Sequence, residues 1–185
     1  MTIKDTCDSE HVFVLVLSGV TEIGPSVLDA IFEAGCDDST PSIRSGRVYL
    51  TFQRTAPTIK DAVLSAIRDI KRANIGAEVL RVDDCNHVSQ ADIARRINRS
   101  RQQVGQYVSG NRGPGNFPAP VCGLTEGPPL WMWCEVSFWL WQNGIIGEAV
   151  LDASRVVAGI NSALDFLHQQ RLDPSLLEEV LRISK

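Results

Sequence analysis

The sequence has 185 residues, of which 44% are hydrophobic and 22% charged, and a formal net charge of −4 at pH 7. These values are ordinary for a soluble globular protein with one large domain or two small ones. No apolar run approaches the length of a membrane span, and the first ten residues, MTIKDTCDSE, contain no apolar signal segment. We therefore expect a cytoplasmic protein that does not contact a membrane.

The cysteines and histidines do not form a pattern typical of a metal or redox site. The number of cysteines is odd, which argues against a disulfide framework, and no two have CxxC spacing. Cys85 and His87 are close in sequence but are too few for a structural zinc site. The chain also has no nucleophile elbow, phosphate loop or histidine-centred constellation. We expect no cofactor, no metal and no enzymatic activity.

The first part of the chain predicts four strands and two helices in the order βαββαβ. Apolar and β-branched runs favour the strands, and helical apolar spacing favours the helices. The predicted elements are a strand over 11–18, a helix over 26–34, strands over 42–44 and 48–53 paired through Ser45-Gly46, a helix over 58–71 and a strand over 77–82. This order is typical of a ferredoxin-like α+β domain, which we expect over residues 1–84.

Two pairs of acidic residues, Asp37-Asp38 and Asp83-Asp84, are candidates for metal ligands or catalytic carboxylates. Both pairs flank the ends of predicted elements, where aspartate is common in turns and caps. The turn interpretation is favoured. The polar stretch from Asp83 to Val88 is the expected domain boundary.

The stretch from Val88 to Gly110 predicts two short helices with a tight turn between them. The first helix is expected over Gln90–Ile97 with Ser89 as its N-cap, and Asn98 occupies the turn. The second is expected over Ser100–Ser109, with Val104 and Val108 as its buried edge. This arrangement is a helix-turn-helix.

The second helix would present a guanidinium group and amides outward. Arginine can pair with guanine and glutamine with adenine in the DNA major groove. The stretch 86–116 holds five arginines and one acid, a formal +4 on a chain of −4, which is typical of phosphate binding. The alternative is an ordinary helical hairpin with a solvated charged face. The outward residues are Arg101, Gln102, Gln103 and Gln106.

The segment after Gly110 predicts a loop, a small hairpin and a third helix. The loop NRGPGNFPAP carries Arg112, placed to touch phosphate. Strands are expected over 121–124 and 129–133, and a helix over 133–141. Together with the two preceding helices they predict a winged helix-turn-helix over residues 85–144.

The segment IARRINRSRQQVGQYVSGNRGPGNFPAPV…PLWMWCEVSFWL resembles the excisionase-like, MerR-related winged DNA-binding proteins of bacteria, especially a group of actinobacterial regulators. The resemblance covers residues 87–144. It rests on three motifs: the recognition-helix pattern R-S-R-x-x-V, the loop G-x-R-G-P-G-x-F-P-x-P and the return P-L-W-x-W-x-E-V.

The resemblance implies binding of duplex DNA, with the second helix in the major groove and the hairpin against the backbone or minor groove. Cys134 stands where the family usually has a Ser or Thr cap, and the hairpin tip LTEGPP has an acid, Glu126, and no cation. We therefore expect the hairpin to add little phosphate attraction. The candidate DNA-binding residues are Arg99, Ser100, Arg101, Gln102, Gln103, Gln106, Tyr107, Asn111 and Arg112.

Four tryptophans lie between residues 131 and 141, and we expect them to form a core rather than a base-stacking platform. Tyr107 either packs beside Val104 or reaches a phosphate through its hydroxyl. Two further amphipathic helices are predicted over 148–170 and 175–183, separated by Asp173-Pro174. This tail, residues 145–185, is expected to pack on its own chain, build a dimer or bind a partner protein.

The expected function is that of a transcriptional regulator that binds double-stranded DNA sequence-specifically. The favoured form is a repressor that binds an inverted repeat as a homodimer. The alternative is an antitoxin-like or adaptor protein. Its N-terminal domain or C-terminal helices would bind and neutralise a partner protein, and its DNA binding would only be autoregulatory.

Overall fold

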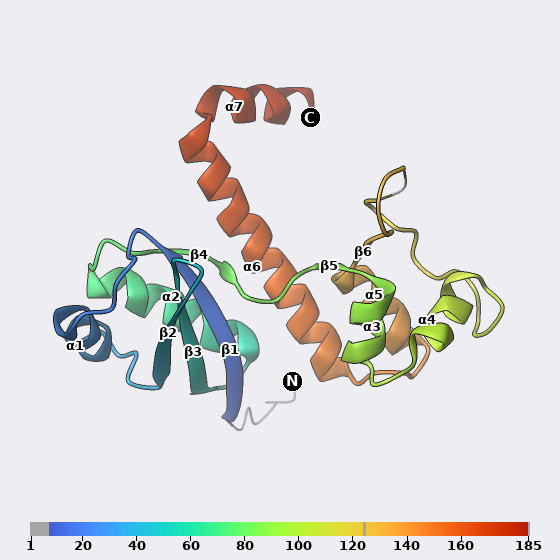
Figure 1. The fold of residues 1–185 in the computed structure, drawn as a ribbon, viewed down its shortest axis with the longest axis horizontal. Coiled ribbons are helices and arrows are strands. Elements are labelled where there is room, and N and C mark those ends of the chain that lie inside the picture. The colour runs from blue at the N-terminus through green and yellow to red at the C-terminus, as the bar shows by residue number, and fades with distance from the viewer. Residues whose placement is uncertain (1–7, 124, 185) are drawn as a thin grey trace, which may run out of the picture. The chain divides into compact units, whose positions relative to one another are not determined.

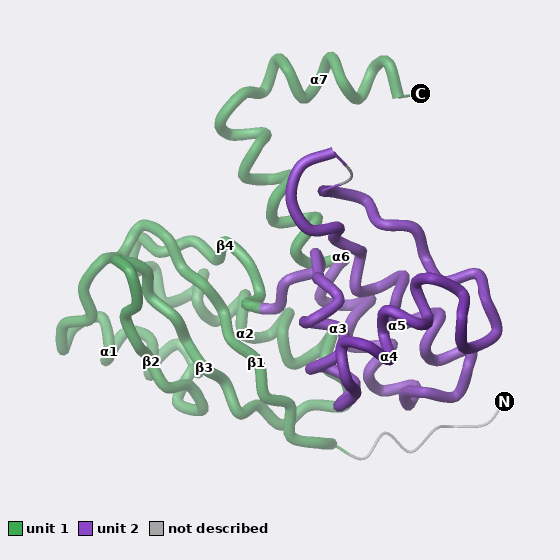
Figure 2. Tube along the Cα trace, turned by 45° about the vertical axis from the view of Figure 1, so that its right-hand side comes forward, with its two compact units in different colours: residues 1–83, 159–185 green, residues 84–158 purple. Residues whose placement is uncertain are grey.

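The computed structural model describes residues 8–123 and 125–184 and has an α+β fold (Figure 1). These residues form seven helices and two antiparallel sheets, one of four strands and one of two. The chain divides into two compact units, residues 1–83 with 159–185 (unit 1) and residues 84–158 (unit 2) (Figure 2). The first seven residues, with Cys7, and the expected strand position Leu124 lie outside the described residues.

Three regions are expected from the sequence (1–84, 85–144 and 145–185), whereas the structure divides into two compact units. The expected boundary after residue 84 lies one residue from the division between residues 83 and 84. The expected tail does not form a unit of its own, because helix α6, Glu148–Leu172, contributes residues to both units.

Unit 1 is built on the four-stranded sheet, whose strand order is β2-β3-β1-β4 with every neighbouring pair antiparallel. The predicted strands are confirmed: the first three are longer than predicted and the fourth is one residue shorter. The strands are β1 Ser9–Ser18, β2 Ser39–Arg44, β3 Arg47–Ala56 and β4 Glu78–Val82.

The hairpin between β2 and β3 forms as the sequence predicts. Ser45 and Gly46 have φ of 49° and 73°, so both turn residues are left-handed, which suits the twist of a two-residue hairpin. The alternation of β3 buries Val48, Leu50 and Phe52, each at most 1% exposed. This face of the sheet forms the core of unit 1.

Two helices, α1 over Pro25–Glu33 and α2 over Ile59–Ala73, cover that face of the sheet (Figure 1). The hydroxyl of Thr58 caps α2 by accepting a hydrogen bond from the Asp61 amide, 3.1 Å away. The buried residues of α2 recur at helical spacing, so the predicted amphipathic pattern is confirmed. They are Ala62, Val63, Ala66 and Ile70.

The edge of β4 is closed by the buried side chain of Asn161 from α6. Its Oδ1 accepts a hydrogen bond from the Val82 amide at 2.8 Å, and its Nδ2 donates to the Val82 carbonyl at 3.0 Å. One side-chain amide thus satisfies both backbone groups of this residue, as a neighbouring strand would.

Unit 2 packs three helices around tryptophan side chains. Trp131, Trp133 and Trp139 are buried, so the predicted core role is confirmed for them. The prediction is wrong for Trp141, which is 39% exposed and stacks on Phe138 at the surface. The elements of unit 2 are β5 His87–Val88, α3 Gln90–Arg96, α4 Arg101–Val108, β6 Trp131–Met132 and α5 Trp133–Gln142, with the first residues of α6.

Of the expected hairpin over 121–133, the described residues show one isolated bridge, between Cys122 and Leu130. The second strand, β6, pairs instead with β5, which lies in the stretch expected to be a domain boundary. Pro128 and Pro129 have no N–H to contribute to a ladder, so the pairing cannot continue toward the turn.

The start of α5 also differs from expectation. Its N-cap is Met132 rather than Cys134, and no side chain within the helix caps it. Asn86, far away in the sequence, caps the helix instead. Its backbone carbonyl accepts a hydrogen bond from the Trp133 amide at 2.6 Å, and its Oδ1 accepts one from the Cys134 amide at 3.1 Å. Two of the amides at the start of the helix are therefore satisfied by the residue before β5.

The chain ends in α7, Pro174–Ile183, which follows the predicted break at Asp173-Pro174. The Asp173 carboxylate caps α7 by accepting a hydrogen bond from the Leu176 amide at 3.0 Å, and this bond holds the pKa of the carboxyl below its usual range. None of its residues is buried. Within the described residues, every helix is too short or too polar to serve as a membrane span.

Candidate nucleic-acid interface

The first helix of the pair, α3, begins with a reciprocal cap. The Ser89 hydroxyl accepts from the Asp92 amide at 3.3 Å, while the Asp92 carboxylate accepts from the Ser89 amide at 3.0 Å and from its hydroxyl at 2.7 Å. The Ser89 hydrogen bonds, with the nearby Arg95 guanidinium, hold the pKa of Asp92 below its usual range. Sequence-local interactions thus fix where the helix begins.

Residues 97–100 form the turn that joins α3 to α4. Asn98 has a φ of 52°, the left-handed conformation that asparagine tolerates. The Ser100 hydroxyl then caps α4 by accepting from the Gln103 amide at 3.2 Å. Ile93 and Val104 are fully buried in the shared core, so the two helices are held in one relative orientation.

The structure leaves most candidate DNA-binding side chains on the surface. Gln103 and Gln106 are half-buried, and Tyr107 is buried at 8% exposure. The remainder are exposed and come from three consecutive pieces of chain: the turn, the start of α4 and the loop after it. These exposed candidates are Arg99, Ser100, Arg101, Gln102, Asn111 and Arg112.

The five arginines of this region divide into two groups. Arg95 pairs with Asp92, and Arg96 pairs with Asp84 and lies over the Trp133 ring, 4.8 Å from its centroid. Arg96 is therefore held by several contacts within unit 2, whereas Arg95 is paired through one nitrogen and its side chain stays 75% exposed.

Arg99, Arg101 and Arg112 have no ion pair within the described part of the chain. Three guanidinium groups on the exposed side of α4 and its flanks are thus available to an anionic partner, fewer than the five that the sequence suggests.

The loop that carries Arg112 is fastened to the tryptophan core. The indole of Trp139 donates to the Gly115 carbonyl and that of Trp131 to the Pro118 carbonyl, both at 2.9 Å. The Phe117 ring meets both indoles edge-on, with centroids 5.0 Å from Trp139 and 6.3 Å from Trp131. The glycine- and proline-rich loop is held in place beside α4 by these contacts.

The Tyr107 ring packs into the core, and its hydroxyl accepts a hydrogen bond within the protein. Its ring lies 5.5 Å from Trp139, and its hydroxyl accepts a hydrogen bond from Gln103 Nε2 at 3.0 Å. Helical spacing alone predicted that Gln103 faces outward and did not predict this hydrogen bond. The spacing of four residues along a helix is the signal that could have revealed it.

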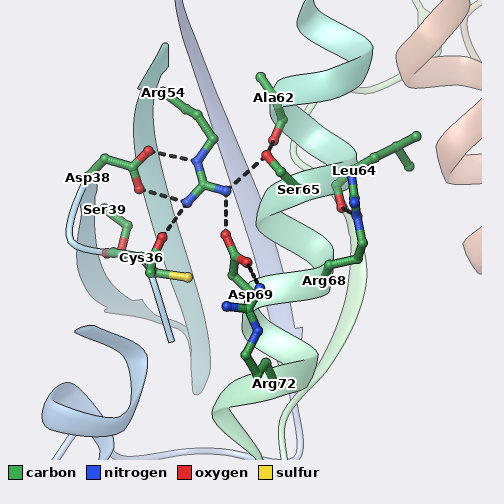
Figure 3. A network of polar contacts seen from close by, with 11 residues as sticks. Cys36, Asp38, Ser39, Arg54, Ala62, Leu64, Ser65, Arg68, Asp69 and Arg72 are labelled. Carbon is green, nitrogen blue, oxygen red and sulfur yellow. Dashed lines mark hydrogen bonds and ion pairs between the residues drawn. The ribbon is translucent and has the colours of Figure 1, made fainter. Parts of the chain in front are cut away.

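A second polar cluster, in unit 1, centres on Arg54 of β3 (Figure 3). Asp38 receives two of its N–H groups at 2.7 and 2.9 Å, and Asp69 of α2 receives one at 2.7 Å. The Gly35 carbonyl and the Ser65 hydroxyl accept the remaining two. All five donors are satisfied, and the bonds to Asp38 and Asp69 raise the pKa of the guanidinium above its ordinary value.

This cluster gives Asp38 a role that the sequence analysis did not foresee, as the partner of a buried cation. The signal was present in β3, because Arg54 continues the alternation of Val48, Leu50 and Phe52 and so lies on the core face. No group of three or more metal-ligating side chains forms within residues 8–123 and 125–184.

Cys36 lies beside this cluster and is 2% exposed. Burial, together with the charge of Asp69, raises the pKa of its thiol to about 11. The thiolate that would act as a nucleophile or metal ligand is therefore disfavoured.

Comparison with known proteins found no family model, no curated protein and no solved structure that matches this chain.

Proposed function

We propose that unit 2 is a winged helix-turn-helix domain of the excisionase-like, MerR-related type, and that the protein is a bacterial transcriptional regulator that binds duplex DNA sequence-specifically. The observation that carries the proposal is the surface of α4. Its first two side chains, Arg101 and Gln102, are exposed, and Arg99 and Arg112 flank them without an ion pair in the described residues.

The chemistry of that surface suits the DNA major groove. Arginine can donate two hydrogen bonds to guanine O6 and N7, and glutamine can exchange a donor and an acceptor with adenine. Arg99 and Arg112 lie to either side in sequence and would bind phosphates, which position a protein without reading bases. The Ser100 cap and the buried Val104 support a rigid α4.

In this proposal a short wing is formed by residues 121–132. Two observations support it: the β5–β6 pair and the bridge between Cys122 and Leu130. The tip between Gly123 and Pro128 carries Glu126 and no cation. In this proposal the wing contributes shape rather than phosphate attraction.

We also propose that unit 1 is a ferredoxin-like domain. The element order βαββαβ and the antiparallel sheet order β2-β3-β1-β4, with α1 and α2 on one face, support this assignment. Such a domain can bind a ligand, a copy of itself or another protein, so it does not by itself choose a function.

The proposed regulator is a homodimer that represses from an inverted repeat. A single module of this size buries little surface and reads few bases, and useful specificity requires two half-sites about one helical turn apart, or a multiple of that. The exposed apolar side chains of helix α7 favour contact with another protein chain, because Leu176, Val180 and Leu181 are 44–57% exposed.

The same exposed helix supports a second candidate function. In an antitoxin-like or adaptor protein, α7 would be covered by a different protein, and DNA binding would be autoregulatory. The mass of the protein co-expressed with the products of its neighbouring genes separates the two: a mass of two identical chains supports the homodimer, and a stoichiometric complex with another product supports the adaptor.

Selection of bound sites from a random pool of duplex DNA tests the DNA-binding proposal. We expect a motif with inverted half-sites, recovered by the full chain and lost by the triple variant Arg99→Ala, Arg101→Ala, Arg112→Ala. The control is the variant Arg68→Ala, which removes an exposed cation of unit 1. A pool that stays random with the full chain at low salt would contradict the proposal.

A further inference from the structure

Gln103 differs from the other two glutamines of α4 because its amide is held within the protein. Its Nε2 donates to the Tyr107 hydroxyl at 3.0 Å. Gln102 and Gln106 make no side-chain hydrogen bond to any described residue. Two of the three amides are therefore free to rotate, and the third has a fixed neighbour.

The hydroxyl that holds Gln103 is itself a fixed point. The Tyr107 ring is 8% exposed and lies 5.5 Å from the Trp139 ring. On another side it meets Gly113, where an added Cβ would lie 3.3 Å from ring atom Cδ1. Trp139 also binds the Gly115 carbonyl, so core and loop together determine where the hydroxyl lies.

The remaining hydrogen-bonding groups of Gln103 match one base. A primary amide has two N–H donors and one carbonyl acceptor. With one N–H used by Tyr107, one donor and the carbonyl remain. Adenine presents N7 as an acceptor and N6 as a donor in the major groove, so the pair that remains on Gln103 is complementary to it.

Orientation before binding also has an energetic consequence. A free glutamine must give up side-chain rotational freedom when it contacts a base, which reduces the discrimination it delivers. A side chain already held in place loses less. Gln103 should therefore discriminate between bases more strongly than Gln102 or Gln106, although it is less exposed than Gln102.

We propose that Tyr107 is a positioning residue that orients Gln103 for reading an adenine, and that Gln103 is the glutamine of α4 that sets base choice. This inference rests on the proposed DNA-binding function and names the residue pair that gives that function its selectivity.

The test compares the full chain with the variant Tyr107→Phe, which removes the hydroxyl and keeps the ring. Affinities are measured for the selected site and for its variants at each single base pair. We expect the preference at one adenine position to fall roughly fivefold, the factor for one hydrogen bond of about 1 kcal/mol. Preferences at all other positions, and the thermal melting followed by tryptophan fluorescence, should not change.

Two glutamine variants locate the effect. Gln103→Ala should abolish the preference at the same adenine position, and Gln102→Ala, the matched control, should leave that position intact. In the Gln103→Ala background, Tyr107→Phe should have no further effect on base preference, since the group that it orients is gone. This double variant keeps the test valid if Tyr107→Phe alone lowers the melting temperature.

Three outcomes would overturn the inference. A loss of affinity that is equal for all sequences would make Tyr107 merely structural. Unchanged base preference in Tyr107→Phe, or a further effect of that change on base preference without Gln103, would show that the hydroxyl does not orient the amide. If the unaltered chain selects no site at all, the DNA-binding proposal itself fails, which is a distinct result.

Discussion

Arg54 of unit 1 and Arg101 of unit 2 are both arginines, but one guanidinium is buried and the other is exposed. Arg54 is 7% exposed and donates all five of its N–H groups to acceptors in its own unit. Arg101 is exposed at the start of α4 and has no ion pair in the described part of the chain. A guanidinium whose donors are all used can only hold a fold together, whereas one whose donors are free can bind a partner.

The comparison explains why counting charges overstates the candidate interface. Five arginines between residues 86 and 116 suggest a formal +4 island, but Arg95 and Arg96 are tied to Asp92 and Asp84. Free donors, rather than formal charge, identify the surface that could bind the proposed nucleic-acid partner.

The largest expected effect is on the buried arginine. Arg54→Met leaves the Asp38 carboxylate, whose side chain is 26% exposed, without its cation, and leaves Asp69, whose side chain is 14% exposed, paired with Arg72 alone. Removal of one partner from a buried ion pair costs about 3–5 kcal/mol. We expect the free energy of unfolding to fall by that amount, measured by urea unfolding followed by circular dichroism.

The control for this change is Arg99→Met, which removes an exposed arginine and should alter stability by less than about 0.5 kcal/mol. Equal stability of the two variants would show that the Arg54 cluster makes no net contribution to the free energy of unfolding. The difference drawn here between buried and exposed arginines would then not hold.

Arg101→Ala should have the next largest effect, and on DNA binding rather than stability. Loss of a bidentate contact to guanine costs about 1–3 kcal/mol and relaxes the choice at one base pair. Fluorescence anisotropy with the selected site and its single-base variants measures both quantities. An equal loss across all sequences would count against base reading by this residue.

The cap of α3 should contribute about 1 kcal/mol to the stability of unit 2. The pKa of Asp92 is lowered in the folded state by the Ser89 hydrogen bonds. Its contribution is therefore present above the unfolded pKa of about 4 and is lost as the pH falls through the lowered folded value.

Asp92→Asn should accordingly destabilise the protein at pH 7, and the difference from the unaltered chain should shrink as the pH falls below about 4. All four tryptophans lie in unit 2, so their fluorescence during urea unfolding reports on this unit. Asp152→Asn, at an exposed carboxylate of α6, is the control and should leave the transition unchanged. A difference between Asp92→Asn and the unaltered chain that is independent of pH would contradict this explanation.

Arg112→Ala should have the smallest effect. An exposed ion pair contributes about 0.2–1 kcal/mol, and a phosphate contact carries no sequence information. We expect all DNA sequences to be bound more weakly by a similar factor, and the slope of log affinity against log salt to flatten by about one. Anisotropy titrations at several salt concentrations provide the measurement; an unchanged slope would place Arg112 away from the phosphates.

Local sequence signals predicted most elements because those signals act within a few residues. The caps at Ser89 and Ser100, the left-handed turn at Asn98 and the break at Asp173-Pro174 each depend on neighbours in the chain. The candidate residues on the surface of α4 follow from the same local periodicity. These predictions required no knowledge of distant contacts.

Several of the failures involve partners far apart in the chain. The Asn86 cap on α5, the β5–β6 pair and the use of Asp38 by Arg54 join residues 16 to 48 positions apart. The i,i+4 bond from Gln103 to Tyr107 is local, yet it forms because Trp139 and Gly113 hold the ring.

By itself, the sequence determined where this chain turns, which faces are apolar and where its cations gather, since propensity, capping and periodicity act over one or two helical turns. Only the tertiary structure decided which of those polar groups form hydrogen bonds or ion pairs within the protein and which remain exposed to a partner. The reason is that a hydrogen bond or ion pair depends on distance in space, and the folded core, rather than the order of residues, sets that distance.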